Sequence, residues 1–380
     1  MPTAVLAPSI PFFPYPQVFL SEEDDLVAIF RDVGRRGAFI LQREVAEFEE
    51  NLAHFLNVRH AIGVANATDG LLIALRAAGL EPGAEVIFSS HTMVATAAAI
   101  HFAGCAPVAV ECGPDHLVDP AAVAAAVTPR TRAILPTQLN GRAADMDALE
   151  AIRARHGLLL IEDAAQALGA RFRGRCAGTF GAAAALSFFP AKLLGCLGDG
   201  GAVITGDPAL AARAAALHDH GRGADGEIRG WGFNSRLDNL QAAILDYRLR
   251  KYGVVIARRR ALAQAYRDRL AEVAEIVLPP GPDAGPDHFD VYQNYEIEAD
   301  QRDPLRAFLA RRGIGTLLPW GGKAVHQWEA LGLPARLPCT EALFARLLLL
   351  PMHAWLTAEA IEEIAAAIRD FYRGRKRAGQ

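Results

Sequence analysis

Short apolar runs alternate with stretches rich in alanine and leucine over the first half of the chain. The runs are four or five residues long, which is the length of a buried strand, and the stretches between them have the composition of helices. Because strands that alternate with helices build layered folds, the pattern predicts an α/β fold with a mostly parallel central sheet and flanking helices. The expected strands cover residues 60–64, 85–88, 107–110, 133–136 and 158–161.

Helical patterns precede and follow these strands. Prolines recur in the first thirty residues, which are therefore expected to be irregular up to an amphipathic helix at residues 22–30. A strand at residues 202–205 leads into a stretch that is expected to stay helical to residue 250. The other expected helices cover residues 45–56, 71–78, 208–218, 239–249 and 257–270.

The composition changes near Leu278, where prolines and glycines alternate and indicate a linker or a long loop. A smaller α+β unit is expected after it, with a strand at residues 291–297 and helices at 303–312 and 358–372. The predicted division is a large α/β domain over residues 1–250, which begins with an arm over 1–35, and a C-terminal α+β domain over 251–380.

Composition and charge exclude several classes of protein. The 380 residues are 52% hydrophobic and 22% charged, and their net charge of −4 gives no general attraction to nucleic acid or to an anionic membrane. A secretory signal and apolar runs of ~18 or more residues are lacking, so a cytoplasmic location is expected. The five cysteines form no CxxC pair, which predicts reduced packing residues and no metal site.

Two carboxylates, Glu162 and Asp163, follow the last of the expected strands. In open α/β sheets ligands bind beyond the carboxyl ends of the strands, so an acid at this position is placed for a site. The alternative is that Asp163 caps a helix that begins near Ala164.

Small residues follow the first expected strand, in the order Ala65-Asn-Ala-Thr68-Asp69-Gly70. A strand, a tight turn and the beginning of a helix make an anion site, because unpaired amide N–H groups and the positive end of the helix dipole face the ligand. Thr68 adds a hydroxyl donor. The alternative is simple N-capping by Thr68 or Asp69.

Lys192 follows Asp163 in the chain and runs into a glycine-rich stretch at residues 195–201. A lysine amine forms a Schiff base with a carbonyl cofactor such as pyridoxal phosphate, and that cofactor needs an aspartate at its ring nitrogen. A strand follows the glycines, which argues against a dinucleotide loop; we expect them to let the backbone pass close beneath a flat ligand. Taken alone, a lysine is more often a surface charge.

Six ordered segments carry the most specific motifs: Ala67-Thr-Asp-Gly-Leu, His91-Thr-Met-Val-Ala-Thr, Ile161-Glu-Asp-Ala-Ala-Gln, Ser187-Phe-Phe-Pro-Ala-Lys-Leu-Leu-Gly, Gly198-Asp-Gly-Gly-Ala and Gly232-Phe-Asn-Ser-Arg-Leu-Asp-Asn-Leu-Gln-Ala-Ala. They resemble the DegT/DnrJ/EryC1/StrS family of sugar aminotransferases, a branch of the fold-type I pyridoxal-phosphate enzymes related to aspartate aminotransferase. The resemblance covers nearly the whole chain, and the six matches together outweigh the separate alternatives.

The resemblance implies a role for each matching residue. Lys192 is then the lysine that forms the Schiff base and shuttles the proton, and Asp163 is the partner of the pyridinium nitrogen. Gln166 neighbours the phenolic oxygen of the ring. The implied phosphate cradle consists of Thr68, Asp69 through its backbone amide, and Ser187.

Asn234 matches an asparagine that, in this family, reaches the phosphate of the cofactor bound by the other subunit. The resemblance therefore implies a homodimer with shared active sites.

The chain departs from the family pattern near the expected substrate. The family usually places an aromatic residue over the cofactor ring, where this chain has Met93, with His91 two residues earlier; a thioether packs well on a ring. Trp320 stands where the family commonly has His-Tyr. Substrate contacts are expected from His91 and Trp320, and a diphosphate contact from Arg222 or Lys323, for which a solvated position is the alternative.

The implied activity is a ping-pong transamination. Glutamate leaves its amino group on the cofactor, which becomes pyridoxamine phosphate, and the group then passes to a ketone on a nucleotide-linked hexose. The segments around Lys192 look more like the family branch that acts at sugar C3. The alternatives are the same reaction at C4 of a 4-keto-6-deoxy sugar or on a keto-cyclitol, a sugar dehydratase, which Lys192 argues against, and a regulatory protein without catalysis.

Overall fold

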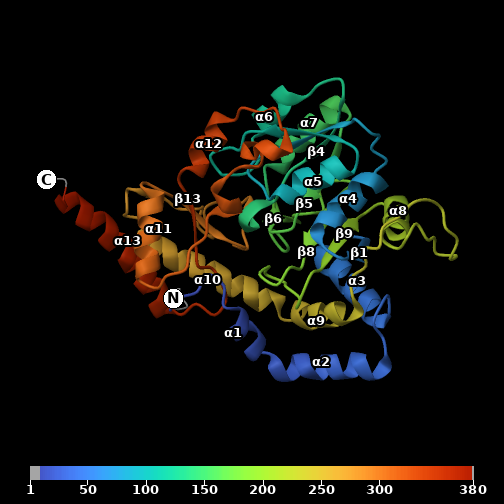
Figure 1. Cartoon of the computed structure of the whole chain (residues 1–380), viewed down its shortest axis with the longest axis horizontal. Coiled ribbons are helices and arrows are strands. Elements are labelled where there is room, and N and C mark those ends of the chain that lie inside the picture. The colour runs from blue at the N-terminus through green and yellow to red at the C-terminus, as the bar shows by residue number, and fades with distance from the viewer. Residues whose placement is uncertain (1–8, 379–380) are drawn as a thin grey trace.

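A seven-stranded sheet forms the centre of the computed structural model, which describes residues 9–378 (Figure 1). The strand order is β1-β9-β8-β5-β4-β2-β3, and all neighbours are parallel except β9, which is antiparallel to both β1 and β8. These strands are β1 (His60–Val64), β2 (Glu85–Ser89), β3 (Ala106–Val110), β4 (Thr131–Leu135), β5 (Leu159–Asp163), β8 (Ala183–Ser187) and β9 (Gly201–Thr205).

Helices cover both faces of this sheet, which explains why its strands are apolar without alternation. Within β2, Ile87 points into one core, whereas Val86 and Phe88 point into the other. The core of Val86 and Phe88 is closed by α4 (Ala67–Ala77), α5 (Val94–Phe102) and α8 (Pro208–His218). The core of Ile87 is closed by α3 (Arg43–Leu56), α6 (Pro120–Ala126), α7 (Met146–His156) and α9 (Asn239–Leu249). The expected α/β fold with a mostly parallel sheet is thus confirmed.

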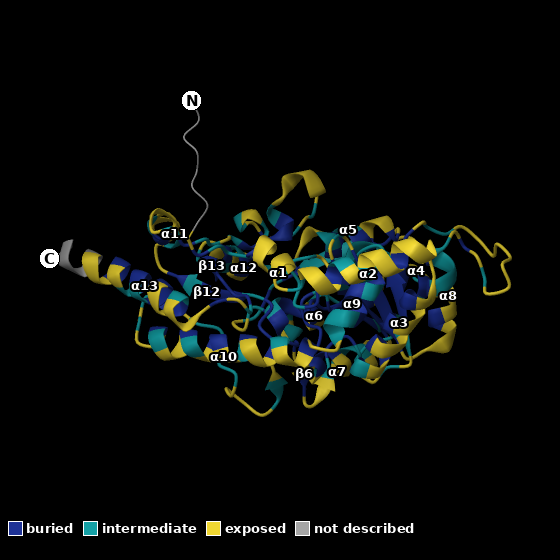
Figure 2. Ribbon diagram, turned by 90° about the horizontal axis from the view of Figure 1, so that it is seen from below, coloured by how far each residue is buried: buried dark blue, intermediate teal, exposed yellow. Residues whose placement is uncertain are grey.

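A third core lies around a smaller antiparallel sheet, whose order is β10-β12-β13. The helix α10 (Tyr252–Leu270) joins this third core to the core of Ile87 (Figure 2). Tyr252 packs in the core of Ile87, and Tyr266 packs in the third core. A third sheet has the order β11-β6-β7. The remaining bounds are β6 (Arg171–Phe172), β7 (Arg175–Cys176), β10 (Ile276–Val277), β11 (His288–Phe289), β12 (Tyr295–Ala299), β13 (Leu347–Leu350), α11 (Arg302–Arg311), α12 (Pro338–Phe344) and α13 (Ala358–Ala378). The division of the chain at residue 250 stays a prediction.

Two helices, α8 and α9, have the expected bounds, and most expected strands differ from the observed ones by one or two residues. The N-terminal expectation was partly wrong: a short helix, α1 (Tyr15–Leu20), precedes α2 (Glu23–Arg36), which continues until Gly37 takes a left-handed conformation with φ 63°. The expectation of continuous helix to residue 250 was also wrong, because residues 219–238 form a loop with the bridges Asp219–Asn234 and Arg222–Ile228.

The strand expected at residues 291–297 begins only at Tyr295. The reason is local: Tyr292 has a left-handed backbone with φ 52°, which takes residues 290–294 out of the sheet direction. Among the described residues, no helix combines the length and the apolar character needed to cross a membrane.

Glu162 fastens the turn at residues 178–181 to β5. Its buried carboxylate accepts hydrogen bonds from the backbone N–H groups of Gly178 (2.7 Å), Phe180 (2.6 Å) and Gly181 (3.0 Å), and from Gln138 Nε2 (2.7 Å). We predict that Glu162→Gln lowers the free energy of unfolding by ~1–3 kcal/mol, because the new amide group meets donors that then lack an acceptor. Urea unfolding measures the change, with the exposed Glu150→Gln as a control that keeps the wild-type midpoint. Equal midpoints for both variants would contradict the prediction.

Candidate active site

The carboxyl ends of β1, β5 and β8 lie together at one edge of the large sheet, which is where open α/β sheets bind ligands. Asp163 is the last residue of β5 and Ser187 the last of β8. The register brings the end of β1 beside them, because Val64 and Ser187 both lie opposite Gly201 on the two sides of β9. Residues that are far apart in the sequence, at 64–70, 163–166 and 187–192, therefore meet at this edge.

The helix α4 begins directly after β1 and points its first turn at this edge. Its N-cap is Asn66, whose side chain accepts a hydrogen bond of 2.9 Å from the N–H of Asp69. Simple capping by Thr68 or Asp69 is therefore wrong. Thr68 lies half-buried in the first turn, and the carboxylate of Asp69 accepts a hydrogen bond of 2.7 Å from Ser235 Oγ. The unpaired amides of this turn make it suitable for an anion such as a phosphate.

Gly201 allows α4 to begin at this position. A Cβ at Gly201 would lie 2.6 Å from the carbonyl carbon of Asn66 and 2.8 Å from the nitrogen of Ala67, so a side chain there would displace the start of α4. We expected the glycines to pass beneath a flat ligand; at Gly201 the close approach is to the backbone of the chain itself.

Asp163 is buried and has two donors on its carboxylate. Thr96 Oγ1 donates to Oδ2 at 2.7 Å, and the N–H of Ala165 donates to Oδ1 at 3.2 Å. No helix begins at Ala164, so the alternative role of Asp163 as a helix cap is wrong. Burial raises the pKa of Asp163, whereas the two hydrogen bonds and the positive charge of Lys192 oppose this rise.

Lys192 lies in the loop between β8 and β9, on the same side as Asp163. Its backbone N–H donates to Phe189 O at 2.8 Å, and its side chain is partly withdrawn from solvent. Burial lowers the pKa of the Lys192 amine to about 8, against the opposing effect of the Asp163 charge. Lys192 is thus no ordinary surface lysine.

Gln166 lies three residues beyond Asp163 in the chain, and its side-chain oxygen already accepts hydrogen bonds. Gln166 Oε1 accepts hydrogen bonds from the N–H of Asn140 at 2.8 Å and from Asn294 Nδ2 at 3.4 Å. The amide nitrogen of Gln166 therefore points away from these two donors.

Met93, expected over the cofactor ring, lines one cavity of about 400 Å³ with Trp320 and Lys323, which are expected near the substrate, and with Trp328. Met93 is 46% exposed, and the Lys323 amine lies 5.0 Å from the centre of the Trp328 ring. The cavity is mostly apolar with one cationic group at its rim.

The structure places the other expected residues elsewhere. His91 is buried, where its Nε2 lies 3.4 Å from Glu296 Oε2 and its ring packs on Phe344. Residues 219–238 form the loop that projects from the edge of the molecule after α8 (Figure 1). Arg222 lies in this loop and is ion-paired with Asp219 at 3.5 Å, whereas the exposed Asn234 lies at its base, where it forms a bridge with Asp219.

Several residues that hold the site escaped the sequence analysis. Thr96 lies inside the motif that begins at His91, but nothing in the sequence indicates that it reaches Asp163. Asn140, Gln293 and Asn294 approach the site from distant parts of the chain, and their sequence neighbourhood carries no signal of this.

Comparisons with known proteins agree with this geometry. The model of the DegT/DnrJ/EryC1/StrS aminotransferase family matches residues 21–369. The chain is 41% identical to the dTDP-3-amino-3,4,6-trideoxy-alpha-D-glucose transaminase of Streptomyces venezuelae, with 96% of each chain covered. It is 38% identical to the UDP-2-acetamido-2-deoxy-3-oxo-D-glucuronate aminotransferase of Pseudomonas aeruginosa, with 91% of this chain and 96% of the relative covered. The structure of S. venezuelae DesV in complex with a ketimine intermediate superposes with a TM-score of 0.92 at 40% identity, over 96% of this chain and 99% of that one.

Asp163 raises the pKa of Lys192 through its charge, so its removal has a predictable effect on the amine. In the protein freed of any cofactor, we predict that Asp163→Asn lowers the pKa of Lys192 below about 8, by roughly one unit. The measurement is the pH dependence of Lys192 labelling by an amine-reactive reagent, followed by mass spectrometry. Glu150→Gln is the control, because it removes a carboxylate that is exposed and binds Arg153 on α7. A midpoint that stays constant or rises in Asp163→Asn would contradict the prediction.

Proposed function

Because the chain belongs to the DegT/DnrJ/EryC1/StrS aminotransferase family, which uses pyridoxal phosphate, we propose that it transfers an amino group from glutamate to a keto group of a nucleotide-linked hexose. The observation that carries this proposal is the meeting of Lys192, Asp163 and the start of α4 at one edge of the sheet. The names of the two relatives above support the substrate class, since both describe transaminases of nucleotide-linked sugars.

The residues present at this edge fit the cofactor. Asp163 has a carboxylate for the ring nitrogen, and Gln166 has a free amide nitrogen for the phenolic oxygen. Thr68, Ser187 and the first amides of α4 offer donors to the phosphate, and Met93 offers a thioether to the ring. When bound, pyridoxal phosphate accepts the amino group and withdraws electrons from the reacting carbon.

Lys192 is the proposed catalytic base. An amine whose pKa is about 8 is unprotonated in a larger fraction of molecules near neutral pH than an ordinary lysine, whose pKa is ~10.4. Its Nζ takes the proton from the Cα of bound glutamate and holds it until the proton is returned. Thr96 supports this step indirectly, because its hydroxyl keeps the Asp163 carboxylate oriented.

The amino group is proposed to enter at C3 of the sugar. The S. venezuelae relative is named for a 3-amino sugar and the P. aeruginosa relative for a 3-oxo sugar, which supports this position. The apolar cavity beside Met93 and Trp320 suits a sugar that has lost hydroxyl groups.

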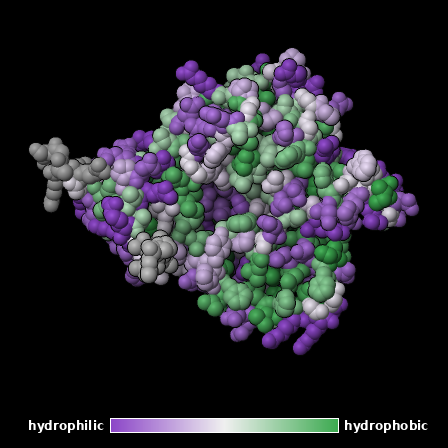
Figure 3. Space-filling model, in the orientation of Figure 1, coloured by the Kyte–Doolittle hydropathy of each residue, from purple (hydrophilic) through white to green (hydrophobic). Residues whose placement is uncertain are grey.

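A homodimer is proposed to complete the site. Large apolar side chains of the N-terminal third are exposed, including Leu20 (63%), Phe30 (63%) and Phe39 (58%), and Figure 3 shows apolar side chains gathered around the region of α2 and α9. Contiguous apolar surface of this kind is typical of an interface. Asn234 lies exposed at the base of the loop after α8, opposite Asp219, from which it is proposed to reach the phosphate in the partner subunit.

The reaction divides into two halves that spectroscopy separates. We predict that glutamate converts the loaded enzyme to the pyridoxamine phosphate form, and that a 3-keto sugar nucleotide restores the original visible absorbance. In Lys192→Ala, both conversions are expected to slow by a factor of 1,000 or more, on the order of the loss of an essential base. A wild-type protein that binds the cofactor but responds to no keto-sugar nucleotide would overturn the substrate class.

The position of amination has its own measurement. We predict that NMR of the product places the new amine on C3 of the hexose. An amine on C4, or turnover of a keto-cyclitol in place of a sugar nucleotide, would replace this assignment by one of the alternatives while leaving the transaminase activity intact.

A further inference from the structure

Residues 290–294 pass between the core of Ile87, in which Val291 packs, and the core of the small sheet, in which Tyr292 packs. The N–H of Val291 donates to Gly141 O at 2.8 Å, and a Cβ at Gly141 would lie 2.6 Å from the nitrogen of Tyr292. Arg259, which is buried, donates from Nη1 to Tyr292 O at 2.9 Å and to Gln293 O at 3.0 Å. With its carbonyls held on one side and Gly141 on the other, this segment has little freedom to shift.

Gln293 binds the backbone on both sides of Lys192. Its Nε2 donates to Ala191 O at 2.9 Å, and its Oε1 accepts from the N–H of Leu193 at 2.9 Å. Both backbone neighbours of Lys192 are thus bound to one buried amide, which determines where the Lys192 side chain starts. A glutamine is suited to this task because it supplies a donor and an acceptor at the same time.

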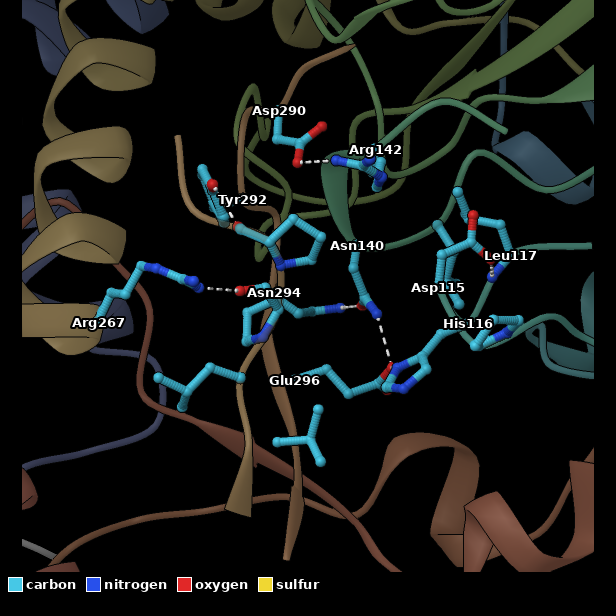
Figure 4. Close-up of a pocket in the computed structure, with 16 residues that line it drawn as sticks. Asp115, His116, Leu117, Asn140, Arg142, Arg267, Asp290, Tyr292, Asn294 and Glu296 are labelled. Carbon is cyan, nitrogen blue, oxygen red and sulfur yellow. Dashed lines mark hydrogen bonds and ion pairs between the residues drawn. The ribbon is translucent and has the colours of Figure 1, made fainter. Parts of the chain in front are cut away.

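Asn294, the next residue, holds Gln166. Its Nδ2 donates to Asn140 Oδ1 at 2.8 Å (Figure 4) and to Gln166 Oε1 at 3.4 Å. The N–H of Asn140 donates to the same oxygen of Gln166. Asn140 has a left-handed backbone, with φ 56°, that turns its N–H toward Gln166. With its oxygen held by two donors, Gln166 presents its NH₂ group in the remaining direction.

Glu296 determines the direction of this hydrogen-bond chain. Burial alone would raise the pKa of Glu296, but His91 and His116 lower it to about 2, so the carboxylate only accepts. Asn140 Nδ2 donates to Glu296 Oε1 at 2.9 Å, which leaves Asn140 Oδ1 to accept from Asn294 (Figure 4). The carboxylate therefore determines the orientation of the amides of Asn140, Asn294 and Gln166 in turn.

We propose that Gln293 and Asn294 are positioning residues, which set from one segment the two groups that work on the cofactor: Gln293 places Lys192, and Asn294 orients the amide of Gln166. The proposal rests on the proposed function. Its content is that these two adjacent residues have separate effects, Gln293 on proton transfer and Asn294 on cofactor binding.

The first experiment tests Asn294 with two substitutions of similar size. Asn294→Asp places a carboxylate against the oxygens of Gln166 and Asn140, whereas Asn294→Leu only removes donors. We expect Asn294→Asp to repel the Gln166 oxygen, which the N–H of Asn140 still binds, and thereby to displace the Gln166 amide. This displacement is expected to raise the Kd for pyridoxal phosphate about tenfold or more and to shift the visible absorbance of the loaded protein. Asn294→Leu is expected to raise the Kd less than about threefold.

The second experiment tests whether Gln293 places the Lys192 amine. In Gln293→Met, which keeps the length of the side chain but neither hydrogen bond, we expect kcat to fall about tenfold or more because the amine is misplaced. The KM for glutamate and the Kd for pyridoxal phosphate are expected to stay within about twofold of wild type. Gln264→Met, at an exposed position on α10, is the control and keeps the wild-type kcat.

Each of the two experiments has an outcome that would overturn the proposal. Equal Kd values for Asn294→Asp and Asn294→Leu, or a Gln293→Met that loses kcat and cofactor affinity together in step with its melting temperature, would show a merely structural role and overturn the proposal. If Asn294→Asp does not fold, an unchanged kcat in Gln293→Met overturns it. A wild-type protein that neither binds pyridoxal phosphate nor transaminates would instead defeat the proposed function.

Discussion

Asp163 is buried at the end of β5, and a carboxylate in that position needs donors and positive charge around it to stay ionised. The protein supplies a hydroxyl from Thr96, an amide from Ala165 and the charge of Lys192. Thr96 is itself bound to Thr92 at 2.9 Å. The start of α5, the end of β5 and the loop after β8 are thereby tied to one group. A protonated ring nitrogen would add the missing positive charge, which explains why this arrangement suits a pyridine cofactor.

The hydrophobic pattern predicts the large sheet well because its strands are buried on both faces and read as continuous apolar runs. It fails at the strand expected over residues 291–297, where the apolar run continues through Val291 and Tyr292 although the backbone there leaves the sheet. The left-handed conformation of Tyr292 depends on Gly141 and Arg259, which are more than thirty residues away in the chain. Tertiary contacts of this kind override the strand that the local hydrophobic pattern predicts.

In the site, too, the residues that sequence motifs predict differ from those that only tertiary contacts reveal. Lys192 and Asp163 are visible in the sequence because the chemistry requires those residue types. The N-cap Asn66 was passed over in favour of Thr68 and Asp69, since all three residue types cap helices and only the geometry distinguishes them. Gln293 and Asn294 act through hydrogen bonds to the backbone and to another amide, and such contacts leave no compositional trace.

The arrangement around residues 290–294 also explains how two cores share one site. Arg259 on α10 binds the carbonyls of this segment, Glu296 on β12 binds Asn140 in the turn after β4, and Gln293 binds the loop of Lys192. A displacement of the small sheet relative to the large one would therefore move the lysine loop and the Gln166 amide together. A site built in this way keeps Lys192 and the Gln166 amide in the same relative position when the two sheets shift, because both are held by adjacent residues of the segment that precedes β12.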